Sequence, residues 1–437
     1  MHIPALLKIL VVFVLVVAAS MRRVHLGLAA AAGGIGLALW SGMPLPDIVR
    51  VTTGELINLD LGLLAILLAG IMGFSAAMKK AGVLDAFAAA VSGMVPSRPL
   101  AMAMTPLLIG TLPMPGGAIL SAPLVDSMNR NPEVDGAVLS AVNYWFRHCL
   151  ELFWPLYPAF ILTSSLTGLP PQRLMLLNFY ALPVLFGLGM LFILPTLGRQ
   201  QGHAGAAMPQ SASNAAHKVE ASPKGLLPLA IVLSVYVLGD CMWRVVSPGL
   251  SMHAGSKALV SRYVPIYLGL LSGALYVWRT AGTVSVFHRA IDRGTVRLIL
   301  VVVGIRVFSA LIGAGGLATQ AARELSSAGI PPLLVIATLP CIAGLVTGVG
   351  FGYVGLAFPI VLGIMPSVHG LPLEAGIVLA GAFGFIGMML SPLHVCMVVS
   401  AEHFHTPLAA TIRRFLLPLG MFLAVAMGYA ALLAFLL

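Results

Sequence analysis

Long apolar stretches separated by short polar segments run along the whole chain. Each long stretch holds roughly the 20 apolar residues that a helix needs to cross a bilayer, whereas a membrane β-barrel would show alternating segments of about 10 residues. The pattern therefore predicts an all-α polytopic membrane protein with about ten transmembrane helices. The predicted spans are 4–20, 25–42, 59–78, 137–164, 175–197, 225–246, 263–278, 297–315, 375–400 and 411–437.

Two further apolar stretches, 99–126 and 332–366, are interrupted by Pro and Gly. Non-helical backbone at membrane depth is tolerated only inside protein or beside a water-filled cavity. We therefore expect each stretch to form a re-entrant hairpin. The alternative is a pair of ordinary kinked helices with close glycine packing.

The composition agrees with a membrane protein, since 59% of the residues are hydrophobic and only 9% are charged. Soluble domains carry roughly 25% charged residues. The formal charge of +10 does not indicate nucleic acid, because the basic residues stand singly or in pairs between apolar runs, as loop anchors do. The four cysteines lack metal-type spacing and are interpreted as buried small hydrophobic residues.

The two halves of the chain resemble each other at an offset of 234 residues. Phe74-Ser75-Ala76 matches Phe308-Ser309-Ala310, and further glycine and proline matches keep the same order. The aligned pairs are Gly82 and Gly316, Pro106 and Pro340, Gly110 and Gly344, and Gly116 and Gly350. A duplication is predicted, with repeats over 1–197 and 225–437 and a polar, flexible linker over 198–224.

The basic residues set the expected orientation. If the linker is cytoplasmic, most Lys and Arg residues face the cytoplasm, including Lys79, Lys80, Arg413 and Arg414. With six elements in each half, one of them re-entrant, the two repeats have opposite orientations. Inverted repeats are typical of secondary transporters.

The hairpin breaks are the predicted substrate site. Pro lacks a backbone donor and Gly escapes helical geometry, so each break exposes amide groups and a helix N-terminus, which attract anions. The predicted residues at the breaks are Pro113, Met114, Pro115, Gly116, Gly117 and Ser121 in the first hairpin, and Thr347, Gly348, Gly350, Gly352 and Tyr353 in the second.

A third feature is the polar run within the predicted span 137–164. At 100° per residue, Asn143, Arg147 and Glu151 fall on one helical face. Arg147 is predicted to hold an anionic substrate and Glu151 to carry a proton; the alternative is a structural ion pair. His148 points away from this face and is interpreted as a packing contact.

In the second half, Ser391 and His394 flank Pro392, which opens the helix within the membrane. Ser391 is predicted to contact substrate. His394 is predicted to accept a proton, with a structural histidine as the alternative. Asp240 and Arg244 are spaced to form a structural pair. No supported motif for catalysis, a nucleotide, a cofactor or a metal is present.

Three strings resemble a known family. Pro113 to Val125, Asn143 to Pro158 and Ser391 to Phe404 are similar to the prokaryotic integral membrane family called domain of unknown function 401. That family is grouped with the ion transporter superfamily, which includes carriers of gluconate, citrate, dicarboxylates and arsenite. The resemblance implies a prokaryotic inner-membrane protein with a scaffold domain, often dimeric, and a transport domain that moves as an elevator. The hairpin tips lack the Ser-Asn-Thr signature of sodium-coupled dicarboxylate carriers.

The sequence thus predicts a secondary active transporter of a small organic anion, coupled to H⁺ or Na⁺, in the lipid bilayer. It is not expected to be an enzyme, and no cofactor, metal or nucleic acid is expected. Two alternatives remain open, a passive anion channel built from the same broken helices and a membrane-embedded enzyme that uses His148, His394 and Glu151.

Overall fold

The fold is built of helices that are long and apolar enough to cross a bilayer. The computed structural model describes residues 3–22, 24–83, 97–112, 117–129, 131–197, 223–288 and 290–437. Within these ranges every regular element is a helix, and eight helices have the length and composition of membrane spans. The predicted class, an all-α polytopic membrane protein, is confirmed.

The helices of the two halves have the following bounds. The first half contains α1 (Ala5–Met21), α2 (Leu26–Trp40), α3 (Leu45–Leu56), α4 (Leu59–Lys80), α6 (Arg98–Ile109), α7 (Ala118–Met128), α8 (Gly136–His148), α9 (Pro158–Thr167), α10 (Pro171–Asn178) and α11 (Ala181–Leu188). The second half contains α13 (Leu227–Val246), α14 (Ala254–Ala281), α15 (Arg293–Ala314), α16 (Leu317–Ser327), α17 (Pro332–Thr347), α18 (Gly350–Ile364), α19 (Leu373–Leu390), α20 (Val395–His403) and α21 (Leu408–Leu436).

The order of helices recurs at the offset found in the sequence. α6 begins at Arg98 and α17 begins 234 residues later at Pro332. Gly82 and Gly316 follow the matching helices α4 and α15, and both adopt left-handed backbone conformations, with φ of 68° and 61°. The opposite orientation of the halves stays a prediction, and residues 198–222 of the expected linker lie outside the described residues.

Three predicted spans are wrong as continuous helices. The span 175–197 is divided into α10, α11 and a π-helix over Gly189–Ile193. The other two spans are broken at a proline. The span 137–164 is divided into α8 and α9, and the span 375–400 into α19 and α20. Both interruptions contain a proline, Pro155 and Pro392, which removes a backbone donor and clashes with the preceding turn. The amphipathic helices α3 and α16 were not among the predicted spans, because they are short and partly polar.

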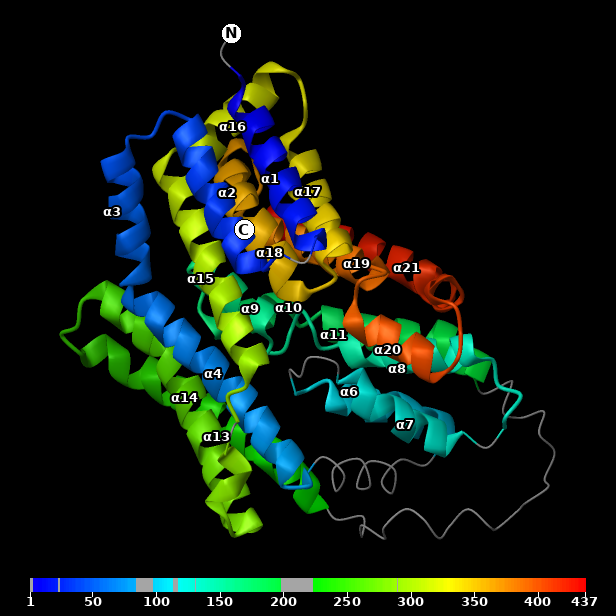
Figure 1. Ribbon diagram of the computed structural model, residues 1–437. Coiled ribbons are helices and arrows are strands. Elements are labelled where there is room, and N and C mark those ends of the chain that lie inside the picture. Colours follow the sequence, from blue (N-terminus) through cyan, green and yellow to red (C-terminus); the bar gives the residue numbers. More distant parts are fainter. Residues whose placement is uncertain are drawn as a thin grey trace.

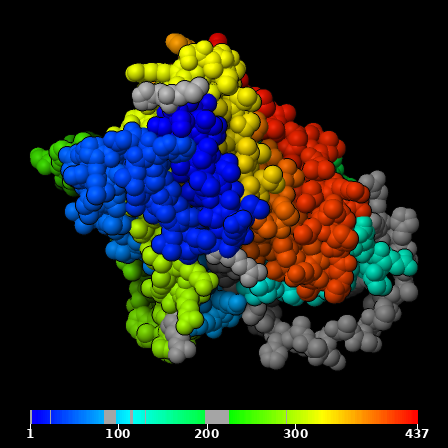
Figure 2. Space-filling view, turned by 45° about the horizontal axis from the view of Figure 1, so that its top comes forward, coloured from blue at the N-terminus to red at the C-terminus, as the bar shows by residue number. Residues whose placement is uncertain are grey.

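The helices form two neighbouring groups (Figure 1). On one side, α13 packs against α14, α14 against α4, and α4 against α15. On the other, α6 packs against α7 and α8, α8 against α20 and α21, and α17 against α18 and α19. We name these the α4–α15 group and the hairpin group. Helix α1 contacts α16 and α17, and in Figure 2 the blue N-terminal helices lie beside the yellow segment of these helices.

A network of buried charges ties the α4–α15 group together. Asp60 of α4 forms ion pairs with Arg262 of α14 at 2.8 Å and with Arg306 of α15 at 3.2 Å. Arg306 also donates to Glu55 of α3 at 2.6 Å. Separately, Arg244 and Asp240 lie 2.9 Å apart, which confirms their predicted pairing.

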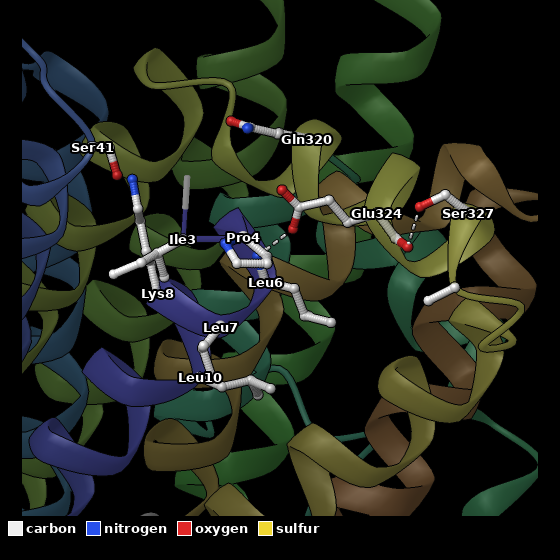
Figure 3. A pocket seen from close by; sticks show the side chains of 11 residues that line it. Ile3, Pro4, Leu6, Leu7, Lys8, Leu10, Ser41, Gln320, Glu324 and Ser327 are labelled. Carbon is white, nitrogen blue, oxygen red and sulfur yellow. Dashed lines mark hydrogen bonds between the residues drawn. The ribbon is translucent and has the colours of Figure 1, made fainter. Parts of the chain in front are cut away.

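The N-terminus of α1 is capped from another helix. The two carboxylate oxygens of Glu324, on α16, each accept a hydrogen bond of 2.8 Å, one from the backbone N–H of Ala5 and one from that of Leu6. Figure 3 shows Glu324 reaching toward the start of α1 at the edge of a hollow of about 600 Å³. A carboxylate at this place satisfies free amides and complements the helix dipole.

Candidate functional site

The second hairpin breaks between α17 and α18, at Gly348. This residue has φ of 64°, a conformation that side chains disfavour. A Cβ at Gly348 would lie only 2.8 Å from the backbone nitrogen of His394 and 2.9 Å from Oγ of Ser391. The break of the second hairpin therefore lies directly against the break between α19 and α20, as the predicted grouping of Ser391 with Thr347 and Gly348 requires.

The first hairpin breaks between α6 and α7, and the segment after α8 supports it. Indole Nε1 of Trp154 donates to the carbonyl oxygen of Thr111 at 2.8 Å, and the Tyr157 hydroxyl donates to that of Gly110 at 2.6 Å. These two bonds satisfy carbonyls that the end of α6 leaves open. Pro113, Met114, Pro115 and Gly116, four of the predicted site residues, lie outside the described residues.

Arg147 connects the first hairpin to the rest of the site. A Cβ built at Gly117 would collide with the guanidinium of Arg147, so the arginine lies directly on the hairpin backbone. Arg147 is buried, with 3% of its surface exposed. Its predicted helical spacing from Glu151 is wrong, because α8 ends at His148 and Glu151 lies in the turns that follow.

A cavity of about 470 Å³ lies between the two groups of helices. From the hairpin group it is lined by Arg147, Glu151, Thr347, Gly348, Gly350, His148, Tyr157, His394 and Cys396. From the opposite side it is lined by residues of α2, α4 and α15, among them Leu26, Met72, Leu298 and Arg297. The structure thus brings six of the predicted site residues to one cavity: Arg147, Glu151, Thr347, Gly348, Gly350 and His394.

Glu151 lies beside the start of α18. A Cβ at Gly350 would be 2.7 Å from Oε1 of Glu151 and 2.9 Å from the Cβ of Ala159. The carboxylate therefore approaches the N-terminus of a helix, where free amides and the helix dipole favour negative charge. Elsewhere, Asp292 caps the N-terminus of α15. The backbone N–H of Thr295 donates to its carboxylate, and this bond holds the pKa of Asp292 below its ordinary range.

Six described residues of the predicted site do not line this cavity. Two of them touch residues that do: Gly117 lies against Arg147, and Ser391 lies against Gly348. The other four make different contacts. Asn143 is fully buried and donates to Oγ of Ser400 at 2.8 Å. The Ser121 hydroxyl donates weakly to the carbonyl of Gly117 at 3.4 Å. Gly352 lies against the Thr347 side chain, and Tyr353 lies against Gly384. These four residues contact the broken helices and not the cavity.

Sequence reasoning missed three residues at the cavity. His148 was interpreted as a packing contact, Cys396 as a small hydrophobic residue, and Tyr157 was not considered. His148 was expected to point away from the site, because that prediction assumed a continuous helix. In the structure α8 ends at His148, and its side chain lines the cavity. The signal that could have found Cys396 is its position two residues after His394, at the start of a helix that follows a proline.

A model of the family described as "Protein of unknown function (DUF401)" matches residues 5–242 and 256–434. The chain belongs to this family. The resemblance of the three sequence strings to DUF401 is thereby confirmed, whereas its grouping with the ion transporter superfamily stays a prediction. No curated protein matches this DUF401 member.

Two solved structures share the fold. The MtrF protein of Neisseria gonorrhoeae, described as illuminating a class of antimetabolite efflux pumps, aligns with a TM-score of 0.57 at 16% identity, over 98% of this chain and 95% of its own. The YdaH transporter of Alcanivorax borkumensis aligns with a TM-score of 0.54 at 16% identity, over 89% and 86%. At this identity the likeness shows the fold alone.

Proposed function

We propose that this DUF401 protein is a secondary active transporter that carries a small organic anion. The observation that carries the proposal is the cavity in which Arg147 meets the break of the second hairpin. A buried arginine beside free amides at a helix N-terminus is suited to bind a carboxylate or another small oxyanion. The two structural neighbours, described as a transporter and as an efflux pump, support transport as the activity.

The position of the cavity supports an elevator motion. Its buried polar side chains come from the hairpin group. The opposite wall presents Met72, Leu298 and Val301, with the exposed Arg297 at its rim. If the hairpin group slides along that wall, the bound anion moves with it and meets the other side of the membrane. The ion pairs of Asp60 hold α4, α14 and α15 together as the fixed part.

Glu151 is suited to couple transport to protons. It is buried, lines the same cavity as Arg147 and lies against the start of α18. A buried carboxyl can be neutral or charged according to what occupies the space around it. Proton release from Glu151 when the anion leaves Arg147 would keep the net charge of the cavity constant, which lowers the cost of moving it through the membrane.

The direct test is a thermal-shift screen of small carboxylates, phosphate and sulfonates on purified protein in detergent. A ligand of the site raises the melting temperature of the wild type and has no effect on Arg147→Ala. Arg279→Gln is the matched control, because Arg279 is exposed on α14 and is not among the residues that line the cavity. Two results would contradict the proposal. One is a ligand that raises the melting temperature of the wild type and of Arg147→Ala equally, and the other is that no carboxylate, phosphate or sulfonate raises it at all.

A further inference from the structure

A cluster of two histidines and one cysteine forms one end of the cavity. His148 ends α8, His394 precedes α20 and Cys396 lies in its first turn. One ring nitrogen of each histidine and Sγ of Cys396 all lie within 4.8 Å of one another. The three side chains are between 3% and 8% exposed, and each lines the cavity.

His148 is oriented as a metal-ligating histidine is. Nδ1 of His148 lies 2.7 Å from the carbonyl oxygen of Tyr144. Because a carbonyl can only accept, Nδ1 carries the proton and Nε2 presents its lone pair. A backbone carbonyl on the second nitrogen is the usual partner of a metal-ligating histidine. Among the described residues, Nδ1 of His394 has no hydrogen-bond partner.

Tyr144 supports both rings. Its ring centroid lies 4.7 Å from that of His148 and 5.2 Å from that of His394, and the two imidazoles stand at 89° to each other. The Tyr144 hydroxyl donates to the carbonyl of Met389 at 3.2 Å, which holds the phenol ring in place. The site therefore has fixed supports behind two of its three candidate ligands.

The donor set selects the kind of ion. Imidazole nitrogen with thiolate sulfur suits zinc and copper(I), whereas magnesium and calcium prefer oxygen ligands. Bonds of about 2.0 to 2.3 Å would place the ligand atoms about 3.3 to 3.8 Å apart in a tetrahedral site. The ligand atoms now lie up to 4.8 Å apart, so they would have to approach one another by about 1 Å to reach that geometry.

We propose that His148, His394 and Cys396 bind a thiophilic transition-metal ion, zinc(II) or copper(I), and leave one coordination position open toward the cavity. On binding, the thiol of Cys396 releases its proton to solvent and the thiolate bonds to the metal. Three protein ligands with an open fourth position distinguish a reactive or ligand-binding metal site from a closed structural one. The site does not depend on which solute the cavity carries.

The test is metal binding by the full-length protein, purified in detergent without a histidine tag and stripped with a chelator. One portion is reloaded with zinc and dialysed to remove the excess, and the zinc that stays bound is measured by mass spectrometry. A second portion is loaded with cobalt(II) as a spectroscopic probe. The wild type is expected to retain about one zinc ion per chain and to show a thiolate-to-cobalt charge-transfer band. Cys396→Ser abolishes the band, and His148→Gln and His394→Gln weaken zinc affinity by at least about 100-fold.

The chain offers matched controls. Cys149, next to His148, donates to the carbonyl of Trp145 and lies outside the cluster, and Cys241 is exposed. Cys149→Ser and Cys241→Ser should retain the metal and the band. Competition between zinc and copper(I), the latter kept reduced, identifies the preferred ion.

A second measurement keeps the proposal testable if Cys396→Ser does not fold. In a chain where Cys396 is the only cysteine, zinc should slow maleimide labelling of Cys396 by at least about 10-fold. A wild type that retains less than about 0.1 ion per chain, or a cobalt spectrum that lacks the thiolate band, would overturn the proposal. Zinc binding of equal affinity by Cys396→Ser and the wild type would also overturn the proposal.

Discussion

The guanidinium of Arg147 lies so close to the backbone of Gly117 that a side chain on Gly117 would collide with it. This contact joins the end of α8 to Gly117, the residue that precedes α7. Arg147 also lines the cavity that the break of the second hairpin borders. Arg147 thus contacts the first hairpin and faces the same cavity as the second.

The first prediction concerns this contact. Gly117→Ala should move Arg147 out of its position and reduce the affinity for the anion by at least about 10-fold, because ligand geometry at an arginine depends on its fixed position. Gly36→Ala on α2 is the control, since a Cβ there meets nothing within 4 Å. Isothermal titration with the ligand found in the screen measures both. Equal affinity for the anion in Gly117→Ala and wild type would show that this contact does not contribute to anion binding.

The second prediction concerns proton coupling. Glu151→Gln keeps the shape of the side chain but cannot bind or release a proton. In proteoliposomes, uptake by this variant should no longer respond to an imposed proton gradient, while exchange of the anion across the membrane continues. Glu133→Gln serves as control, because Glu133 is exposed. Uptake by Glu151→Gln that still follows the proton gradient would assign coupling to another group.

The third prediction concerns the buried charge network. Asp60→Asn leaves Arg262, only 10% exposed, without its anion, and removes one of the two anions of Arg306. Removing one partner of a buried pair costs about 3 to 5 kcal/mol of folding stability. Thermal unfolding in detergent should show a clear loss for Asp60→Asn. Asp47→Asn, which breaks an exposed pair with Arg50, should cost under about 1 kcal/mol; similar losses in both variants would contradict a structural role for Asp60.

The fourth prediction concerns the cap of α1. Glu324→Gln removes the charge that faces the amides of Ala5 and Leu6, and one of the two accepting oxygens. The loss should be about 1 kcal/mol, with faster hydrogen exchange confined to the first turn of α1. Mass spectrometry after exchange measures this. Unchanged exchange in that turn would show that Glu324 does not cap the helix in solution.

Much of the fold could be predicted from local signals. The break of the second hairpin could be predicted from its glycine-rich stretch, and Gly348 adopts a positive φ there. Proline alone did not mark the break, since Pro340 and Pro359 lie inside α17 and α18. The duplication was predicted mainly from matching small residues. Two of them, Gly82 and Gly316, both adopt the left-handed conformation, which requires glycine at those positions. Such constraints act on single positions and can be detected along the chain.

The rest depends on contacts between distant residues. The span 137–164 was predicted as continuous, because its apolar composition hides the turns after His148; there, Trp154 and Tyr157 bind the end of α6 instead of continuing the helix. The cluster of His148 with Cys396 joins residues of α8 and α20. No spacing rule relates them, because the pairing follows from tertiary packing.

The transport proposal requires the cavity beside Arg147 to hold an anion and to open alternately to the two sides of the membrane. Counterflow in proteoliposomes tests it most directly: vesicles are loaded with the unlabelled anion and diluted into labelled anion. A carrier gives a transient accumulation of label above equilibrium, which Arg147→Ala should abolish and Arg279→Gln should retain. A wild type whose label only rises to equilibrium, at rates unaffected by the internal anion, would contradict the account.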